Sequence, residues 1–235
     1  MPAERPGQQV SSRSEVDAFL DAVRAMPARP GGARRGRLIF ALDATASRKP
    51  TWDRACHIQA EMFHETATLG GLDVQLVFYR GFRECKSSKW HSDPDALGRV
   101  MTGVACLGGQ TQIGKVLSHA KTETARGKVD ALIFVGDAFE EDIDAVCHVA
   151  GELGVLGVPV FVFHEGGDRI AADAFRQIAR LTHGAYCPFD LSSADRLKDL
   201  LAAVAVYAAG GRKALADFGA KRGEAVKLLT SQMRR

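Results

Sequence analysis

Long hydrophobic runs are missing from this 235-residue sequence: none approaches the roughly 20 apolar residues that a membrane-spanning helix needs. The first nine residues, MPAERPGQQ, also contain no apolar stretch of signal-peptide length. We therefore expect a cytoplasmic protein without a membrane partner. The chain is long enough to bury one large core, and its hydrophobic content of 46% is typical of a globular protein.

Paired cysteines and clustered histidines are also missing. The five cysteines are odd in number, widely scattered and without a Cys-x-x-Cys pair, which is typical of reduced, mostly buried thiols. The seven histidines are equally dispersed, and no two share a helical face with a carboxylate at ligand spacing. These absences argue against both a disulfide framework and a zinc site.

The sequence has no glycine-rich phosphate-binding turn. Its first apolar strand is followed by ATASRKP, in which no glycine occurs, and the phosphate-binding lysine loop is absent as well. Dinucleotide binding is therefore disfavoured.

Charge is distributed unevenly along the chain. The net charge is +3, but residues 1–37 carry +3 and residues 212–235 carry +5, which leaves about −5 on residues 38–211 by difference. A mildly acidic central region argues against nucleic-acid binding, and the basic ends are interpreted as solvated segments.

Short apolar runs alternate with amphipathic helical patterns from Arg37 onward. This alternation predicts an α/β fold with a doubly wound, mostly parallel sheet, covered by helices on both faces, and one short antiparallel strand near residues 82–86. Strands are expected at 38–43, 74–79, 131–135, 158–163 and 185–189. Helices are expected at about 52–69 and 94–104. Three further helices are expected where apolar residues recur on one helical face, beginning at Ile113, Ile143 and Phe175, and a last helix is expected to end at Gly210-Gly211.

The chain divides into three parts. Residues 1–36 are expected to form an N-terminal tail with a short amphipathic helix, whose apolar stripe includes Val16 and Phe19, and a Pro/Gly-rich linker. Residues 37–211 are expected to form the α/β domain, and residues 212–235 a basic, helical C-terminal tail.

Three polar segments stand where a doubly wound sheet offers a binding site. The first strand ends in Asp43-Ala44-Thr45-Ala46-Ser47, a Gly-Gly-Gln-Thr loop ending at Thr111 precedes a helix, and a second apolar strand ends in Gly136-Asp137. Ligands bind beyond the carboxyl ends of such strands, where the strand order reverses. Asp43 and Asp137 are expected at the two strand ends that flank this point. Their oxygens, with the nearby hydroxyls, suit a hard divalent cation such as Mg²⁺.

This ordered set resembles the metal-ion-dependent adhesion site (MIDAS) of the von Willebrand factor A (VWA) family, whose pattern is Asp-x-Ser-x-Ser, a later Thr and a later Asp. Four of the five positions match in residue type, and Thr45 replaces a serine. The resemblance covers roughly residues 36–208 and implies a VWA/Rossmann-like fold. It also implies a metal site formed by Asp43, Thr45, Ser47, Thr111 and Asp137 that holds Mg²⁺, or Mn²⁺ or Ca²⁺.

The resemblance implies a function in protein binding. Because Mg²⁺ prefers six oxygen ligands, the site keeps a position open for a Glu or Asp carboxylate of a protein partner. We expect an adaptor module without catalytic activity of its own. AAA+ ATPases are among the partner classes that the family suggests.

An alternative comes from the haloacid-dehalogenase-like phosphatases. There Asp43 would be the nucleophile that attacks phosphate, and Mg²⁺ would be shared with Asp137 or Asp142. That family places a second Asp two residues after the nucleophile as general acid, whereas this chain has Thr45. The adhesion-type interpretation is favoured for this reason. The acids at 140–142 are interpreted as helix N-terminal charge.

Overall fold

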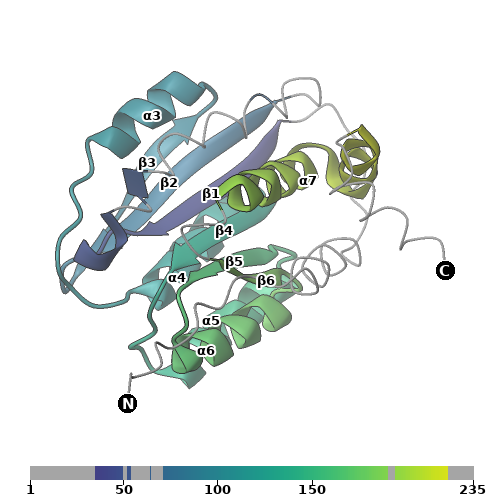
Figure 1. Ribbon diagram of the computed structural model, residues 1–235. Helices are drawn as coiled ribbons and strands as arrows, with labels where there is room; N and C mark the ends of the chain where they lie inside the picture. Colours follow the sequence, from purple (N-terminus) through teal and green to yellow (C-terminus); the bar gives the residue numbers. More distant parts are fainter. Residues whose placement is uncertain (1–34, 50–51, 54–63, 65–70, 190–193, 222–235) are drawn as a thin grey trace, which may run out of the picture.

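The structure is a computed structural model that describes residues 35–49, 52–53, 64, 71–189 and 194–221 (Figure 1). In this part of the chain a single six-stranded sheet has the order β3-β2-β1-β4-β5-β6. All neighbouring strands are parallel except β2 and β3. The strands are β1 (Gly36–Asp43), β2 (Leu72–Arg80), β3 (Glu84–His91), β4 (Ala131–Gly136), β5 (Val160–Glu165) and β6 (Ala185–Phe189).

Helices cover both faces of the sheet (Figure 1). One face packs against α3 (Pro94–Thr102) and α7 (Ala194–Lys221), in a core that includes Leu38 and Phe40. The other packs against α4 (Ile113–Arg126), α5 (Ile143–Val155) and α6 (Arg169–Leu181), in a core that includes Ile39 and Phe134. The doubly wound, mostly parallel architecture predicted from the sequence is confirmed. Because successive strand residues point to opposite faces, β1 can be apolar throughout and still fill both cores.

The strand order reverses between β1 and β4. The chain builds β2 and then β3 on one side of β1, and it returns through α4 to place β4 on the other side. Leu42 of β1 pairs with Val135 of β4. Both strands therefore end at the same edge of the sheet, so that Asp43 and Asp137 lie at the predicted reversal point.

The antiparallel strand is longer than predicted and lies further along the chain. The sequence indicated residues 82–86, whereas β3 spans Glu84–His91. Its sequence ECKSSKWH is mostly polar, because an edge strand buries little of its surface and charged side chains also discourage pairing with other chains. Apolar periodicity therefore could not locate its end.

The helical geometry breaks at Gly211, where the last helix was predicted to end. Gly211 has a positive φ of 68°, and a second helical stretch follows this kink, so that α7 as a whole spans Ala194–Lys221. The predicted N-terminal helix lies outside the described residues, as does most of the helix predicted at 52–69. The described residues contain no helix long and apolar enough to cross a membrane.

His164 is a buried, titratable group of the sheet. It lies on β5 with a relative exposure of 1%, its Nδ1 lies 2.9 Å from the Tyr186 hydroxyl, and its ring contacts Phe175 edge-on. Burial lowers the pKa of His164, and the nearby charges of Asp137 and Asp168 offset this only in part.

We predict that His164 makes the fold sensitive to mild acid. Because its folded-state pKa lies below the unfolded value, stability is lost as pH falls from about 6.5 through the folded-state pKa. Urea unfolding at pH 7.5 and 5.5 should show a lower unfolding free energy at pH 5.5, and a smaller difference in His164→Gln. His148→Gln, at an exposed position on α5, is the matched control. Equal pH dependence in wild type and His164→Gln would contradict the prediction.

Candidate metal centre

The last residue of β1, Asp43, has a buried carboxylate. Asp43 has a relative exposure of only 2%, and both of its oxygens accept hydrogen bonds. The Thr45 backbone N–H donates to Oδ1 at 2.7 Å, and the Tyr79 hydroxyl donates to Oδ2 at 3.0 Å. The direction of the carboxylate is therefore fixed by two donors, one from the turn after β1 and one from β2.

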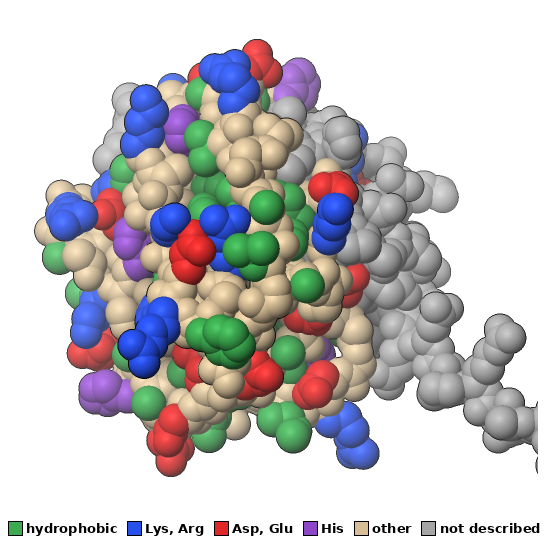
Figure 2. All heavy atoms as spheres, turned by 90° about the vertical axis from the view of Figure 1, so that its left-hand side faces the viewer, with side chains coloured by type: hydrophobic (Ala, Val, Ile, Leu, Met, Phe, Trp, Pro, Cys, Tyr) green, Lys and Arg blue, Asp and Glu red, His purple; other side chains and the backbone are tan. Residues whose placement is uncertain are grey.

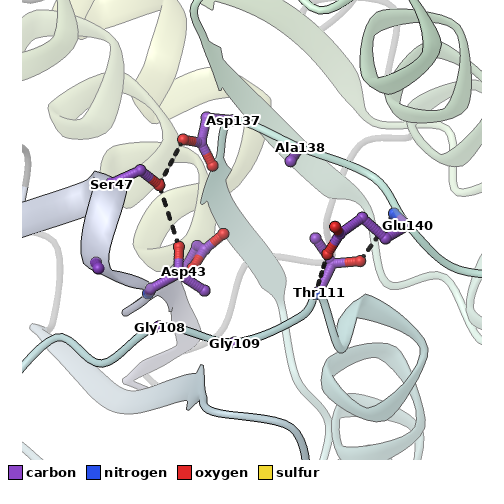
Figure 3. Close-up of a pocket in the computed structure, with 10 residues that line it drawn as sticks. Asp43, Ser47, Gly108, Gly109, Thr111, Asp137, Ala138 and Glu140 are labelled. Carbon is purple, nitrogen blue, oxygen red and sulfur yellow. Dashed lines mark hydrogen bonds between the residues drawn. The ribbon is translucent and has the colours of Figure 1, made fainter.

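Hydroxyl groups connect the β1 and β4 strand ends. The chain leaves β1 through the short 3₁₀ helix η1 (Ala46–Arg48), which places Thr45 and Ser47 over the strand end. The Ser47 hydroxyl donates to Asp137 Oδ2 at 2.9 Å, and it lies 3.3 Å from the Thr45 hydroxyl. Figure 3 shows Ser47 and Asp137 facing one another across this gap.

Thr111 lies at the other side of the same cavity and pairs with Glu140 (Figure 3). The Glu140 N–H donates to the Thr111 hydroxyl at 2.9 Å, and the Thr111 N–H donates to Glu140 Oε2 at 3.1 Å. The Thr111 oxygen keeps lone-pair capacity for a further contact, because a hydroxyl can accept twice. All five predicted ligand residues line this cavity of about 300 Å³, together with Ala46, Gly108, Gly109, Ala138 and Glu140.

The electrostatics of the cavity favour a cation. None of its lining residues is basic, while Asp43, Asp137 and Glu140 are acidic. Burial raises the pKa of Asp43, and the neighbouring Asp137 charge raises it further, against the opposing hydrogen bonds from Thr45 and Tyr79. A bound cation would relieve both effects.

The donor set fits a hard, hydrated ion. Within the described parts of the chain, no three His, Cys, Asp or Glu side chains lie close enough to hold a metal by themselves. Two carboxylates supplemented by three hydroxyls remain, which suits oxygen-preferring Mg²⁺, Mn²⁺ or Ca²⁺ with retained waters. The assignment of the five residues as ligands stays a prediction.

Loops around the cavity are tied closely together. The Gln110 N–H donates to the Gly81 carbonyl at 3.1 Å, and the Leu107 N–H donates to the Ala44 carbonyl at 3.0 Å. A Cβ atom at Gly109 would collide with the Gly81 carbonyl, so the predicted Gly-Gly loop needs glycine there for close approach. The cavity rim is thus held by backbone contacts between three separate segments.

The three acids after Asp137 have separate roles, which the sequence interpretation merged. Only Asp142 caps the following helix, accepting from the Ala145 N–H at 2.9 Å. Glu140 binds Thr111, and Glu141 accepts from the N–H groups of Ile113 and Gly114 at the start of α4. Tyr79 was not predicted as a site residue either, because nothing in a buried strand sequence indicates which neighbour its hydroxyl meets.

We predict that Glu141→Ala destabilises the protein by about 1–2 kcal/mol, because α4 loses its capping carboxylate. The helix has no alternative cap, since the Gln112 side chain makes no capping hydrogen bond. Glu141→Gln keeps an acceptor oxygen and should lose less. Chemical unfolding of the three proteins measures this order, and equal stability of Glu141→Ala and wild type would refute it.

Comparison with known proteins adds the fold family. No protein-family model and no curated protein matches the sequence. Among solved structures, similar folds occur in proximal thread matrix protein 1 from the mussel byssus, in a form with a zinc occupied MIDAS motif (TM-score 0.59, 18% identity, 73% of this chain and 48% of that chain). They also occur in the vWF domain of the type V pili tip protein Mfa5 from Porphyromonas gingivalis (TM-score 0.61, 11% identity, 83% of this chain and 99% of that chain). A third structure with a similar fold is the SpRpn10 VWA domain (TM-score 0.53, 10% identity, 67% of this chain and 88% of that chain).

These similarities define the class of protein. The chain is a doubly wound α/β domain with an acidic cavity at its strand-order reversal. Its fold is the von Willebrand factor A fold, as the sequence resemblance predicted. At these identities the likeness establishes the fold alone. The chain also spans about half the length of the mussel protein that it matches.

Proposed function

We propose that this VWA domain is a divalent-cation-dependent protein-interaction module. Asp43, Thr45, Ser47, Thr111 and Asp137 would hold the ion, and a Glu or Asp side chain of a partner would complete its coordination. The observation that carries the proposal is the convergence of these five residues on one acidic cavity without a basic side chain. The bound ion would supply a positive charge to which the partner carboxylate binds. AAA+ ATPases stay among the candidate partners.

The arrangement around Asp43 favours ligation over phosphoryl transfer. A nucleophilic carboxylate needs an oxygen aimed at phosphorus and a general acid close by. Both oxygens of Asp43 are hydrogen-bonded, and its neighbour in the loop is Thr45, which has no acidic proton at ordinary pH. A binding role without catalysis is therefore the function we propose.

We predict that Mg²⁺ or Mn²⁺ stabilises the fold by roughly 1–3 kcal/mol at saturating concentration, because the ion binds only the folded state. The melting temperature should be higher in millimolar Mg²⁺ than in EDTA. Asp43→Ala should remove this difference. Asp173→Ala, an exposed acid on α6 that pairs with Arg176, should retain it.

Two results would count against this function. Identical melting curves of the wild-type protein in EDTA and Mg²⁺ would argue against the metal site. Hydrolysis of a phosphomonoester that is abolished by Asp43→Asn would instead support the phosphatase alternative.

The cavity rim offers apolar side chains for a partner. Phe82 is 74% exposed at the turn after Gly81, and Leu107 is 48% exposed beside Gly108. The loop after Leu107 lines the cavity through Gly108 and Gly109, and the Gln110 to Gly81 hydrogen bond joins it to the turn that carries Phe82. Figure 2 shows hydrophobic side chains among lysines and arginines on the left-hand side of the Figure 1 view. By contrast, Trp52 and Trp90 do not serve as surface anchors: Trp52 is buried against Phe78, and Trp90 is half-buried and binds Glu123.

We predict that displayed random peptides selected on the protein in Mg²⁺ contain an acidic residue beside an apolar one. Their binding should be lost in EDTA and weakened about tenfold by Phe82→Ser, because a truncated aromatic anchor costs more than about 1 kcal/mol. Val155→Ser is the matched control, since Val155 is 91% exposed at the far end of α5. Selected peptides that bind equally in EDTA would contradict the model.

A further inference from the structure

We propose that Tyr79 is a positioning residue of the metal centre, whose hydroxyl holds the Asp43 carboxylate in the orientation that receives the cation. The inference rests on the proposed metal-dependent function and adds a determinant of its affinity. Tyr79 does not line the cavity and would not touch the ion. Its effect would pass through Asp43.

The sheet register places the two residues opposite one another. Asp43 of β1 pairs with Tyr79 of β2, and the Ala44 N–H donates to the Tyr79 carbonyl at 2.9 Å. The Tyr79 side chain is fully buried on the sheet face that α4 covers, and its hydroxyl reaches Asp43 Oδ2 at 3.0 Å. Backbone pairing and the side-chain hydrogen bond therefore fix the same two strand ends.

The aromatic ring has little freedom to move. It stacks on Phe134 of β4 with centroids 6.3 Å apart and an interplanar angle of 17°. Phe134 in turn contacts Phe175 of α6 edge-on at 5.5 Å. Rotating the ring away from Asp43 would disturb this packing and leave a buried hydroxyl unpaired, which costs about 1–3 kcal/mol. The hydroxyl is thus a preorganised donor.

The bond leaves Asp43 able to bind a metal. An ionised carboxylate has about four lone-pair sites, and the hydrogen bonds from Thr45 and Tyr79 occupy at most three of them. These donors fix the plane of the carboxylate and leave at least one site for a cation. Outer-shell partners that orient a ligand in this way typically change metal affinity by 10- to 100-fold.

Tyr79→Phe tests the role because it removes the hydroxyl and keeps the ring. Tyr207→Phe is the matched control: it removes a hydroxyl from a buried tyrosine of α7 that packs on Phe161, in the core on the opposite face of the sheet from Tyr79. Mn²⁺ binding is measured by the loss of the free-ion EPR signal and, independently, by competition with Mg²⁺. Melting in EDTA reports on structure alone.

We expect the Mn²⁺ dissociation constant to rise about tenfold in Tyr79→Phe and to stay unchanged in Tyr207→Phe. A Tyr79→Phe protein that melts lower in EDTA but binds Mn²⁺ as the wild type does would overturn the inference, since the hydroxyl would then be purely structural. If wild-type protein takes up no Mn²⁺, the proposed function itself fails, and this inference fails with it.

Phe134→Leu provides a second route if Tyr79→Phe does not fold. It loosens the stack behind the Tyr79 ring and keeps the hydroxyl, so Mn²⁺ binding should weaken by a smaller factor than in a hydroxyl deletion. An unchanged dissociation constant in Phe134→Leu would also count against the role of Tyr79.

Discussion

A buried carboxylate at the end of the central strand is the constraint on which the candidate site depends. Asp43 is almost inaccessible to water and has Asp137 as a charged neighbour, so both desolvation and like charge oppose its ionisation. The Thr45 amide and the Tyr79 hydroxyl compensate for part of this cost. A carboxylate held under such conditions has a functional rationale if a cation neutralises it, because a merely structural position is more easily filled by an apolar residue.

The strand order explains why these groups meet. Residues 43 and 137 are far apart in the chain, yet β1 and β4 are parallel neighbours, and their carboxyl ends share one edge. The loop carrying Thr111 enters the same edge, because α4 begins there before it crosses back to lead into β4. One topological feature therefore assembles oxygens from three segments. Close backbone contacts, such as Leu107 to Ala44, then hold the segments in place.

The sequence predicted the scaffold well because burial leaves a periodic signal. Apolar runs located β1, β2, β4 and β5, and the acids and hydroxyls after them indicated which strand ends carry polar groups. The same signal was weak for β3, whose edge position permits lysines and serines. The break at Gly211 was visible as a glycine pair, and the helix that follows it to Lys221 lies in the segment predicted as a helical tail.

Side-chain pairing between distant segments could not be deduced in the same way. The sequence gives Glu140 and Glu141 as two acids before a helix, which is consistent with capping that helix, whereas they contact Thr111 and the start of α4. Tyr79 reads as one more apolar strand residue until its register with Asp43 is known.

These contacts give the centre its chemical character. Two carboxylates supplemented by hydroxyls supply less negative charge than an all-carboxylate cage, and such a set leaves a divalent ion partly hydrated and partly unneutralised. An additional carboxylate from outside then gains from both the residual charge and the release of water. Because Phe82 and Leu107 are exposed on two loops that the Gln110 to Gly81 hydrogen bond joins, apolar burial would add to ligation in the same contact. Affinity would arise from the two together, and removal of the ion would be sufficient to release the partner.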